Sequence, residues 1–239
     1  MSAAVIVSAG KGLRMNKDIK KQYIPFQGLP LIAHTLRRFT EYVPSENMEN
    51  MEVDAVILVV PAGDMDFVTW EVLEKIYLKK PVILTPGGAE RQHSVLNGLR
   101  AAAPFMRHEN DIVLIHDGVR PFVTHEIITA VISEAFDKGA VIPAMPATDT
   151  LKRVHGGVIV ETVDRAEIFL AQTPQAFWYS LIRNAHEAAA VNDITATDDA
   201  SLLEIMGYSV ATVPGSRANI KITTPEDLMF AEAIADSFS

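Results

Sequence analysis

Short apolar runs alternate with segments of helical periodicity over most of the chain, and this alternation limits the possible folds more than any other feature. Near-continuous apolar runs at 3–7 and 54–60 are typical of strands that are buried on both faces. Segments with apolar residues at helical spacing follow them, at 30–39 and 90–103. The connections are too long for hairpins, so the sequence predicts an α/β fold with a doubly wound, mostly parallel sheet.

The rest of the chain continues this pattern with one interruption. Further strands are predicted at 82–84, 112–115, 141–144, 209–213 and 220–222, and further helices at 64–78, 124–138, 178–191, 198–206 and 225–235. Between them, 148–154 and 158–163 are joined by Gly156-Gly157, which is a hairpin signal. We expect one domain over 1–239 with a β-arm at 146–172. The arm either packs on the core or pairs with another subunit.

Composition excludes several classes of protein. The chain of 239 residues contains no cysteine, which rules out disulfides, zinc–thiolate sites and cysteine nucleophiles. Its start lacks the basic region of a signal peptide, and no apolar run approaches the ~20 residues of a membrane span. A net charge of −9 argues against nucleic-acid binding. We therefore expect a cytoplasmic protein that binds neither membrane nor nucleic acid.

A basic, glycine-containing loop at 8–21 follows the first strand. It begins Ser8-Ala9-Gly10-Lys11-Gly12-Leu13-Arg14-Met15, and five of the 21 Lys and Arg residues lie between Lys11 and Lys21. A dinucleotide fingerprint needs a third glycine at Met15, and neither glycine is followed by the Lys-Ser/Thr pair of a P-loop. Glycines allow backbone N–H groups to approach phosphate closely. The loop thus favours a triphosphate ligand outside these two motifs, although a plain β-to-α turn is the alternative.

Two other loops are expected at the same carboxyl edge of the sheet, where ligands of such folds bind. Asp117, in His116-Asp117-Gly118-Val119-Arg120-Pro121, is suited to holding Mg²⁺ against phosphates, or it bonds only to backbone N–H groups. The loop Gly87-Gly88 enters a helix and could admit a nucleobase, with Ser94 supplying a hydroxyl. A scatter of polar residues could form a second anion site: Thr150, Lys152, Arg153, Arg165, Thr173 and Lys221.

Taken in order, eight motifs resemble the 2-C-methyl-D-erythritol 4-phosphate cytidylyltransferase family over nearly the whole chain. They are Ser8-Ala9-Gly10-x-Gly12-x-Arg14-Met15 with Lys21-Gln22-Tyr23, Gly87-Gly88 with Arg91 and Ser94, His116-Asp117 with Arg120-Pro121, Asp149-Thr150-x-Lys152, Thr162-Val163-Asp164-Arg165, Gln172-Thr173-Pro174-Gln175, Thr197-Asp198-Asp199-Ala200 and Asn219-Ile220-Lys221-Ile222-Thr223. The resemblance implies a Rossmann-like fold of the nucleotide-diphospho-sugar transferase type. It also implies transfer of CMP from CTP to methylerythritol phosphate, Mg²⁺ as cofactor, and a homodimer clasped through the arm.

The resemblance also implies roles for individual residues. Arg14 and Lys21 stabilise the transition state, Arg165 and Lys221 position the sugar phosphate, and Asp117 attends Mg²⁺. Substrate binding is expected from Ser8, Ala9, Gly10, Gly12, Gly88, Ser94, Gly118, Arg120, Thr150 and Thr173. In the family, Thr150 and Arg165 serve the site of the neighbouring subunit. This sequence departs from the family pattern at Lys20, Ala89, Gly118-Val119 and Ala218.

Three alternatives stay open at this point. A cytidylyltransferase acting on ribitol 5-phosphate or another polyol phosphate shares the nucleotide half, but the arm motifs favour methylerythritol phosphate. A non-catalytic nucleotide-binding regulatory module would use the same fold without needing both Arg14 and Lys21. A sugar-nucleotide glycosyltransferase of related fold would need an Asp-x-Asp metal motif, which we expect this chain to lack.

Overall fold

A computed structural model describes residues 1–10, 19–44 and 51–237 of the chain. Its strands are β1 (Ser2–Val7), β2 (Pro25–Phe26), β3 (Leu29–Pro30), β4 (Ala55–Val60), β5 (Val82–Pro86), β6 (Ile112–Asp117), β7 (Ala140–Pro146), β8 (Leu151–His155), β9 (Val158–Val163), β10 (Phe169–Ala171), β11 (Gln175–Trp178) and β12 (Ala211–Pro214). Its α-helices are α1 (Leu31–Thr40), α2 (Met65–Glu71), α3 (Arg91–Ala102), α4 (His125–Lys138), α5 (Tyr179–Val191), α6 (Asp199–Ile205) and α7 (Pro225–Ser237).

The central sheet has the strand order β10-β7-β11-β6-β1-β4-β5, and β12 pairs with β7. The pairs β1–β4, β1–β6, β4–β5 and β7–β12 are parallel. β11 runs antiparallel to both β6 and β7, and β10 runs antiparallel to β7. The expected α/β fold with a mostly parallel sheet is therefore confirmed.

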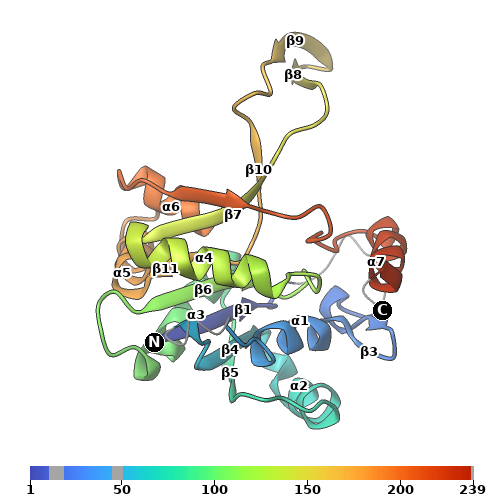
Figure 1. Ribbon diagram of the computed structural model, residues 1–239, viewed down its shortest axis with the longest axis vertical. Helices are drawn as coiled ribbons and strands as arrows, with labels where there is room; N and C mark the ends of the chain where they lie inside the picture. Colours follow the sequence, from blue (N-terminus) through green and yellow to red (C-terminus); the bar gives the residue numbers. More distant parts are fainter. Residues whose placement is uncertain (11–18, 45–50, 238–239) are drawn as a thin grey trace.

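Alternate residues of the buried strands serve opposite faces of the sheet. In β1, Ala4 and Ile6 join a core that contains residues of α1, α2 and α4. Ala3 and Val5 join a second core with residues of α3, α5 and α6. Because both faces are covered, these strands read as continuous apolar runs rather than as an alternation. Figure 1 shows the helices lying on either side of the sheet.

The hairpin of the arm projects from the sheet (Figure 1). β7 and β10 form its base, and β8 and β9 pair antiparallel at its tip. Gly156 and Gly157 make the tip turn with φ of 56° and 80°, a left-handed conformation that favours glycine. The expected hairpin is thus confirmed, although its first strand begins at Leu151 rather than at 148.

Two of the expected elements were wrong, and two strands of the central sheet were not predicted. The helix predicted over 64–78 is only the short α2, which ends at Glu71 and is flanked by 3₁₀ turns at Ala62–Asp64 and Leu73–Lys75. No strand forms at 220–222; Ile222 is buried in a third core beside α7 and donates one backbone hydrogen bond to Val119. The strands β10 and β11 were not predicted. Among the described residues, no helix combines the length and the apolar character needed to cross a bilayer.

Candidate active site

A cavity of about 740 Å³ lies at the carboxyl ends of β1, β4, β5 and β6. β1 is the strand at which the chain order of the sheet reverses, because the connection after β4 and β5 crosses back to β6 on the other side of it. This is the ligand-binding position of open α/β sheets. Eight of the predicted site residues line the cavity: Ser8, Ala9, Gly10, Lys21, Gly88, Ser94, Asp117 and Lys221.

Strand register brings these loops together. Val7 is paired with Asp117 on one side and with Val59 on the other. The next backbone groups continue the ladder, since Ser8 N–H donates to the Val59 carbonyl at 2.8 Å and Gly118 N–H donates to the Val7 carbonyl at 2.9 Å. The first loop and the Asp117 loop therefore leave the sheet side by side, although they are more than 100 residues apart in the sequence.

Glycines permit the close packing of these loops. A Cβ on Gly88 would lie 2.4 Å from the Cβ of His93. A Cβ on Gly118 would lie 2.7 Å from Ile32 Cδ1 and 2.8 Å from Ser8 Oγ. Neither position has room for a side chain, so Gly118 acts on the pocket by letting its loop approach Ser8.

The side chain of Gln22 holds the backbone of the first loop in place. Gln22, in the short 3₁₀ turn Lys21–Tyr23, donates from Nε2 to the Ser8 carbonyl at 2.9 Å and to the Gly10 carbonyl at 3.3 Å. Ser8 Oγ is buried and has no hydrogen-bond partner in the protein. A buried hydroxyl without a partner is costly, which suits a group that bonds to a bound ligand.

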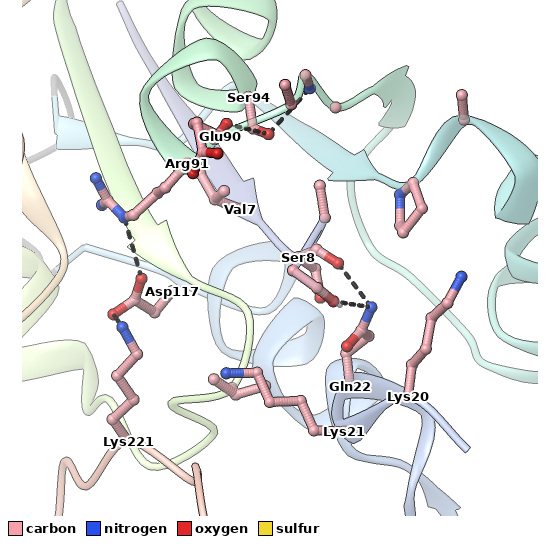
Figure 2. A pocket seen from close by; sticks show the side chains of 18 residues that line it. Val7, Ser8, Lys20, Lys21, Gln22, Glu90, Arg91, Ser94, Asp117 and Lys221 are labelled. Atoms are coloured by element: carbon pink, nitrogen blue, oxygen red, sulfur yellow. Dashed lines mark hydrogen bonds and ion pairs between the residues drawn. The ribbon is translucent and has the colours of Figure 1, made fainter. Parts of the chain in front are cut away.

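Asp117 is the electrostatic centre of the pocket. Three cations surround its carboxylate: Lys221 Nζ at 2.9 Å, Arg120 Nε at 3.4 Å and Arg91 Nε at 3.6 Å. Burial alone would raise the pKa of Asp117, but the charges of Lys221, Arg91 and Arg120 outweigh it and hold the pKa well below its usual range. Figure 2 shows Asp117 between Arg91 and Lys221, with Lys21 beside the same cavity. The cations outnumber the carboxylate, so the pocket favours an anionic ligand.

Arg91 was given no role by the sequence, although it belongs to one of the recognised motifs. It is the first residue of α3 and lines the cavity. Besides approaching Asp117, its guanidinium donates from Nη2 to Asp199 Oδ2 at 2.7 Å. A single arginine at a helix start gives no functional signal in a sequence, because its partners lie far along the chain.

Two predicted substrate-binding residues lie behind Asp117 instead of lining the cavity. Thr173 Oγ1 accepts a hydrogen bond from the Asp117 backbone N–H at 3.1 Å and bonds to His116 Nδ1 at 2.9 Å. Arg120 donates from Nη1 to the Asn219 carbonyl at 2.7 Å. His116, which the sequence gave no catalytic role, is fully buried, and burial lowers its pKa to about 4. These residues fix the position of the Asp117 loop.

The family departure at Lys20 has a structural explanation. Lys20 Nζ lies 2.7 Å from both carboxylate oxygens of Asp64, and Tyr23 Oη donates to Asp64 Oδ2 at 2.9 Å. Asp64-Met65-Asp66 is also an Asp-x-Asp triplet, which we had expected the chain to lack. The carboxylate of Asp64 is engaged by these partners, and neither aspartate lines the cavity. The triplet therefore does not provide a glycosyltransferase metal site here.

The remaining four predicted residues fall into two pairs. Arg14 and Gly12 lie outside the described residues. Thr150 and Arg165 lie on the exposed arm, where Arg165 Nη1 donates to the Thr148 carbonyl. Neither of these arm residues lines the pocket of its own chain.

A metal at this site would rest on Asp117. Within the described ranges, no three His, Asp or Glu side chains gather as a metal-binding group. Mg²⁺ usually takes one or two protein carboxylates and completes its octahedron with water and substrate phosphates. A single carboxylate facing an anion pocket fits that habit, whereas it would not suit a metal that needs a full set of protein ligands.

The fold and the site together define a class of protein. Pockets lined by backbone groups and cations, at the switch point of an α/β sheet, suit nucleotides. Among the described residues that line this one, no serine or cysteine nucleophile lies beside a base, which favours direct transfer. This is the site of a nucleotidyltransferase.

Comparison with known proteins gives the family. The model of the 2-C-methyl-D-erythritol 4-phosphate cytidylyltransferase family matches residues 2–237. A protein of that name from Syntrophus aciditrophicus is 46% identical over 96% of this chain and 94% of its own. Another from Geotalea uraniireducens is 44% identical over 98% of this chain and 96% of its own. The chain belongs to this family.

Solved structures agree. The 4-diphosphocytidyl-2C-methyl-D-erythritol synthase of Anaerococcus prevotii superposes with a TM-score of 0.79 at 33% identity, over 98% of this chain and 96% of that one. The 2-C-methyl-D-erythritol 4-phosphate cytidylyltransferase of Thermus thermophilus superposes with a TM-score of 0.77 at 32% identity, over 99% of this chain and all of that one.

Proposed function

We propose that this chain transfers CMP from CTP to 2-C-methyl-D-erythritol 4-phosphate. The products are 4-diphosphocytidyl-2-C-methyl-D-erythritol and pyrophosphate, in the non-mevalonate synthesis of isoprenoid precursors. The observation that carries this proposal is the cavity at the edge of β1 and β6, where Arg91 and Lys221 contact Asp117 and Lys21 lines the same cavity. Family membership supplies the substrate names.

The proposed reaction brings two negatively charged substrates together, and the cations of this cavity offset their repulsion. A phosphate monoester has a second pKa near ~6, so it is mostly a dianion at neutral pH and needs no general base. It must approach a triphosphate, and like unit charges ~4 Å apart repel by about 4 kcal/mol at an effective dielectric of about 20. Fixed cations offset this repulsion, and positioning with electrostatic stabilisation dominates such reactions.

Within this function, each part of the cavity takes a role. Backbone groups of 8–10 and 87–88 hold the nucleotide, with Ser94 and Gly118 supporting the base pocket. Lys21, together with Arg14, stabilises the negative charge that develops on the α-phosphate. Lys221 offers its ammonium to the phosphate of the acceptor. Asp117 is the residue that would hold Mg²⁺, which when bound neutralises charge on the triphosphate.

The arm is proposed to complete the site of a second subunit. Its exposed apolar residues support a homodimer, because a monomer would leave them in water. They are Val154, Val158, Ile159, Val160, Phe169 and Leu170, each more than half exposed. In such a dimer, Arg165 and Thr150 would reach the acceptor phosphate in the partner's pocket. A cytoplasmic location stays a prediction from the sequence.

The acceptor is tested by pyrophosphate release with CTP and either of two polyol phosphates. We expect turnover with methylerythritol phosphate and little with ribitol 5-phosphate. Turnover of ribitol 5-phosphate alone would instead favour the second candidate, a polyol-phosphate cytidylyltransferase of that specificity. CTP binding without turnover of either acceptor would favour a non-catalytic nucleotide-binding module.

A further inference from the structure

Two buried side chains outside the cavity form a chain of contacts that ends on Arg91. One contacts the guanidinium of Arg91, and the other contacts the first. Asp199, the first residue of α6, accepts from Arg91 through Oδ2 at 2.7 Å. His186, on α5, lies with Nε2 at 3.1 Å from Asp199 Oδ1. Both side chains are about 1% exposed, so neither can touch a ligand in the cavity.

We propose that Asp199 and His186 are positioning residues for nucleotidyl transfer, and that they act by fixing the guanidinium of Arg91 in the pocket. The inference rests on the proposed function for its kinetic consequences. Its structural basis does not depend on that function. It is a series of side-chain contacts from His186 on α5 through Asp199 on α6 to Arg91 at the start of α3.

The charges along this chain can be assigned. Nδ1 of His186 is buried without a partner, so a proton on it would be an unsatisfied buried donor. An ionised carboxylate can only accept, so His186 donates from Nε2 to Asp199 Oδ1. Burial alone would raise the pKa of Asp199, but the Arg91 charge and the His186 hydrogen bond outweigh it and lower the pKa to about 2. Asp199 is thus an anion that holds Arg91.

Arg91 is held from two sides, and this geometry explains why a second carboxylate is needed. Asp117 approaches Nε at 3.6 Å, while Asp199 takes Nη2 at the shorter 2.7 Å. Asp117 is also the residue proposed to meet the metal and has two further cations on it. Asp199 is buried outside the cavity, so it can hold Arg91 without contacting a ligand. These contacts use only part of the five-donor guanidinium, so the rest can serve an anion in the cavity.

The surrounding structure keeps Asp199 in place. The side chain of Gln175, on β11, donates to Asp198 Oδ2 at 2.7 Å and accepts from Ala200 N–H at 3.1 Å. Gln92, next to Arg91, donates to the Ile194 carbonyl at 2.9 Å and accepts from Ala196 N–H at 3.2 Å. The start of α6 is therefore tied to β11, and the start of α3 is tied to the segment that leads into α6.

The first test compares Asp199→Asn with the wild type by two readouts. We expect kcat/KM for CTP to fall about 10- to 100-fold, the range for losing a charged hydrogen bond. We also expect the Arg91 Nε–H resonance, assigned from Arg91→Lys, to broaden in the nucleotide-free protein. The resonance needs no turnover, so it separates failure of this inference from failure of the proposed function. A resonance unchanged in Asp199→Asn would overturn the inference.

The chain offers a matched control on the same pair of helices. Arg100 of α3 and Glu187 of α5 form an exposed bidentate pair at 2.9 and 2.6 Å, away from the cavity. Glu187→Gln should leave kcat/KM and the Arg91 resonance within about twofold of wild type, as exposed pairs contribute little. If Glu187→Gln lowered kcat/KM as much as Asp199→Asn does, any change between α3 and α5 would have that effect. This result would contradict a specific role for Asp199.

A double-mutant cycle then asks whether Asp199 acts through Arg91. In an Arg91→Met background, Asp199→Asn should change kcat/KM by less than about twofold, and the double variant leaves no buried charge unpaired. Equal losses in both backgrounds would overturn the proposal.

The role of His186 is tested by two variants. His186→Gln, which can still donate near the Nε2 position, should restore most of the activity lost in His186→Leu. Equal losses in these two variants would show that His186 does not act through its hydrogen bond to Asp199.

Discussion

The strands of the central sheet and the strands of the arm are alike in sequence and opposite in environment. All six residues of β4 are buried, whereas β9 has five exposed residues of six. Ile57 on β4 is 0% exposed, and Ile159 on β9 is 59% exposed. Apolar side chains are placed in both regions, but only the first set is buried by this chain.

This contrast divides the proposed function between two regions. The sheet builds a pocket whose loops are fixed by register, buried hydrogen bonds and ion pairs, such as Lys221 with Asp117. The arm carries Arg165 and Thr150 on a projecting hairpin that has no such support from the sheet. We infer that the pocket is complete within one subunit for the nucleotide, and that the arm gains its partner surface only in a dimer.

Lys21→Ala should have the greatest effect, because it removes a charge from the proposed transition-state contacts. We expect kcat for pyrophosphate release to fall about 10²- to 10³-fold, with CTP affinity retained in part. Stopped-flow pyrophosphate release and calorimetric CTP titration measure the two quantities. Lys20→Ala is the matched control, since Asp64 already engages that ammonium, and it should change kcat by less than about threefold. Equal losses in the two variants would contradict the assignment.

Ile57→Ala and Ile159→Ala compare the two regions through stability. The buried change should lower the free energy of unfolding by about 2–5 kcal/mol, through lost burial and the cavity left behind. The exposed change should cost less than about 0.5 kcal/mol in dilute, monomeric protein. Urea unfolding gives the free energies, and analytical ultracentrifugation should show that only Ile159→Ala weakens self-association. A monomeric wild type at high concentration would remove the basis for the dimer.

Asp199 gives the pocket region an acid-sensitive contribution to stability. Its pKa is about 2 in the folded protein, against about 3.9 in an unfolded chain. A lowered folded pKa means that this stability is present above about pH 4 and is lost as pH falls toward 2. The difference between these two pKa values corresponds to about 2–3 kcal/mol. Chemical unfolding between pH 5 and 2.5 should show a shallower pH dependence for Asp199→Asn, and an unchanged slope would rule out a major role for this carboxylate.

Sequence patterns predicted the elements whose side chains are buried on both faces. β1, β4 and β6 appear as apolar runs because helices cover both sides of them. β11 was not predicted because its four residues are followed directly by α5. β10 was not predicted because it has only three residues. The pattern over 64–78 predicted one helix, but α2 ends at Glu71 and a 3₁₀ turn follows it at Leu73–Lys75.

The sequence predicted those site residues whose position depends only on where a strand ends. Ser8 and Gly88 lie just after strands and Asp117 ends one, so their place at one edge of the sheet follows from the fold. The Arg91–Asp199 contact joins residues 108 apart and depends on how α3 and α6 pack. Likewise, Thr173 was expected at the ligand but bonds behind Asp117, because β11 passes beside β6. Such contacts come only from the packed structure.

A purified heterodimer most directly tests whether a pocket and an arm from different subunits form one site. Co-expression of Lys21→Ala and Arg165→Ala chains with different tags, followed by two affinity steps, isolates the mixed dimer. If each arm serves the partner's pocket, one site of the two is intact, and pyrophosphate release should reach about half of the wild-type rate per dimer. Each parent homodimer should stay below about a tenth of it. A heterodimer no more active than the mean of its parents would contradict the account.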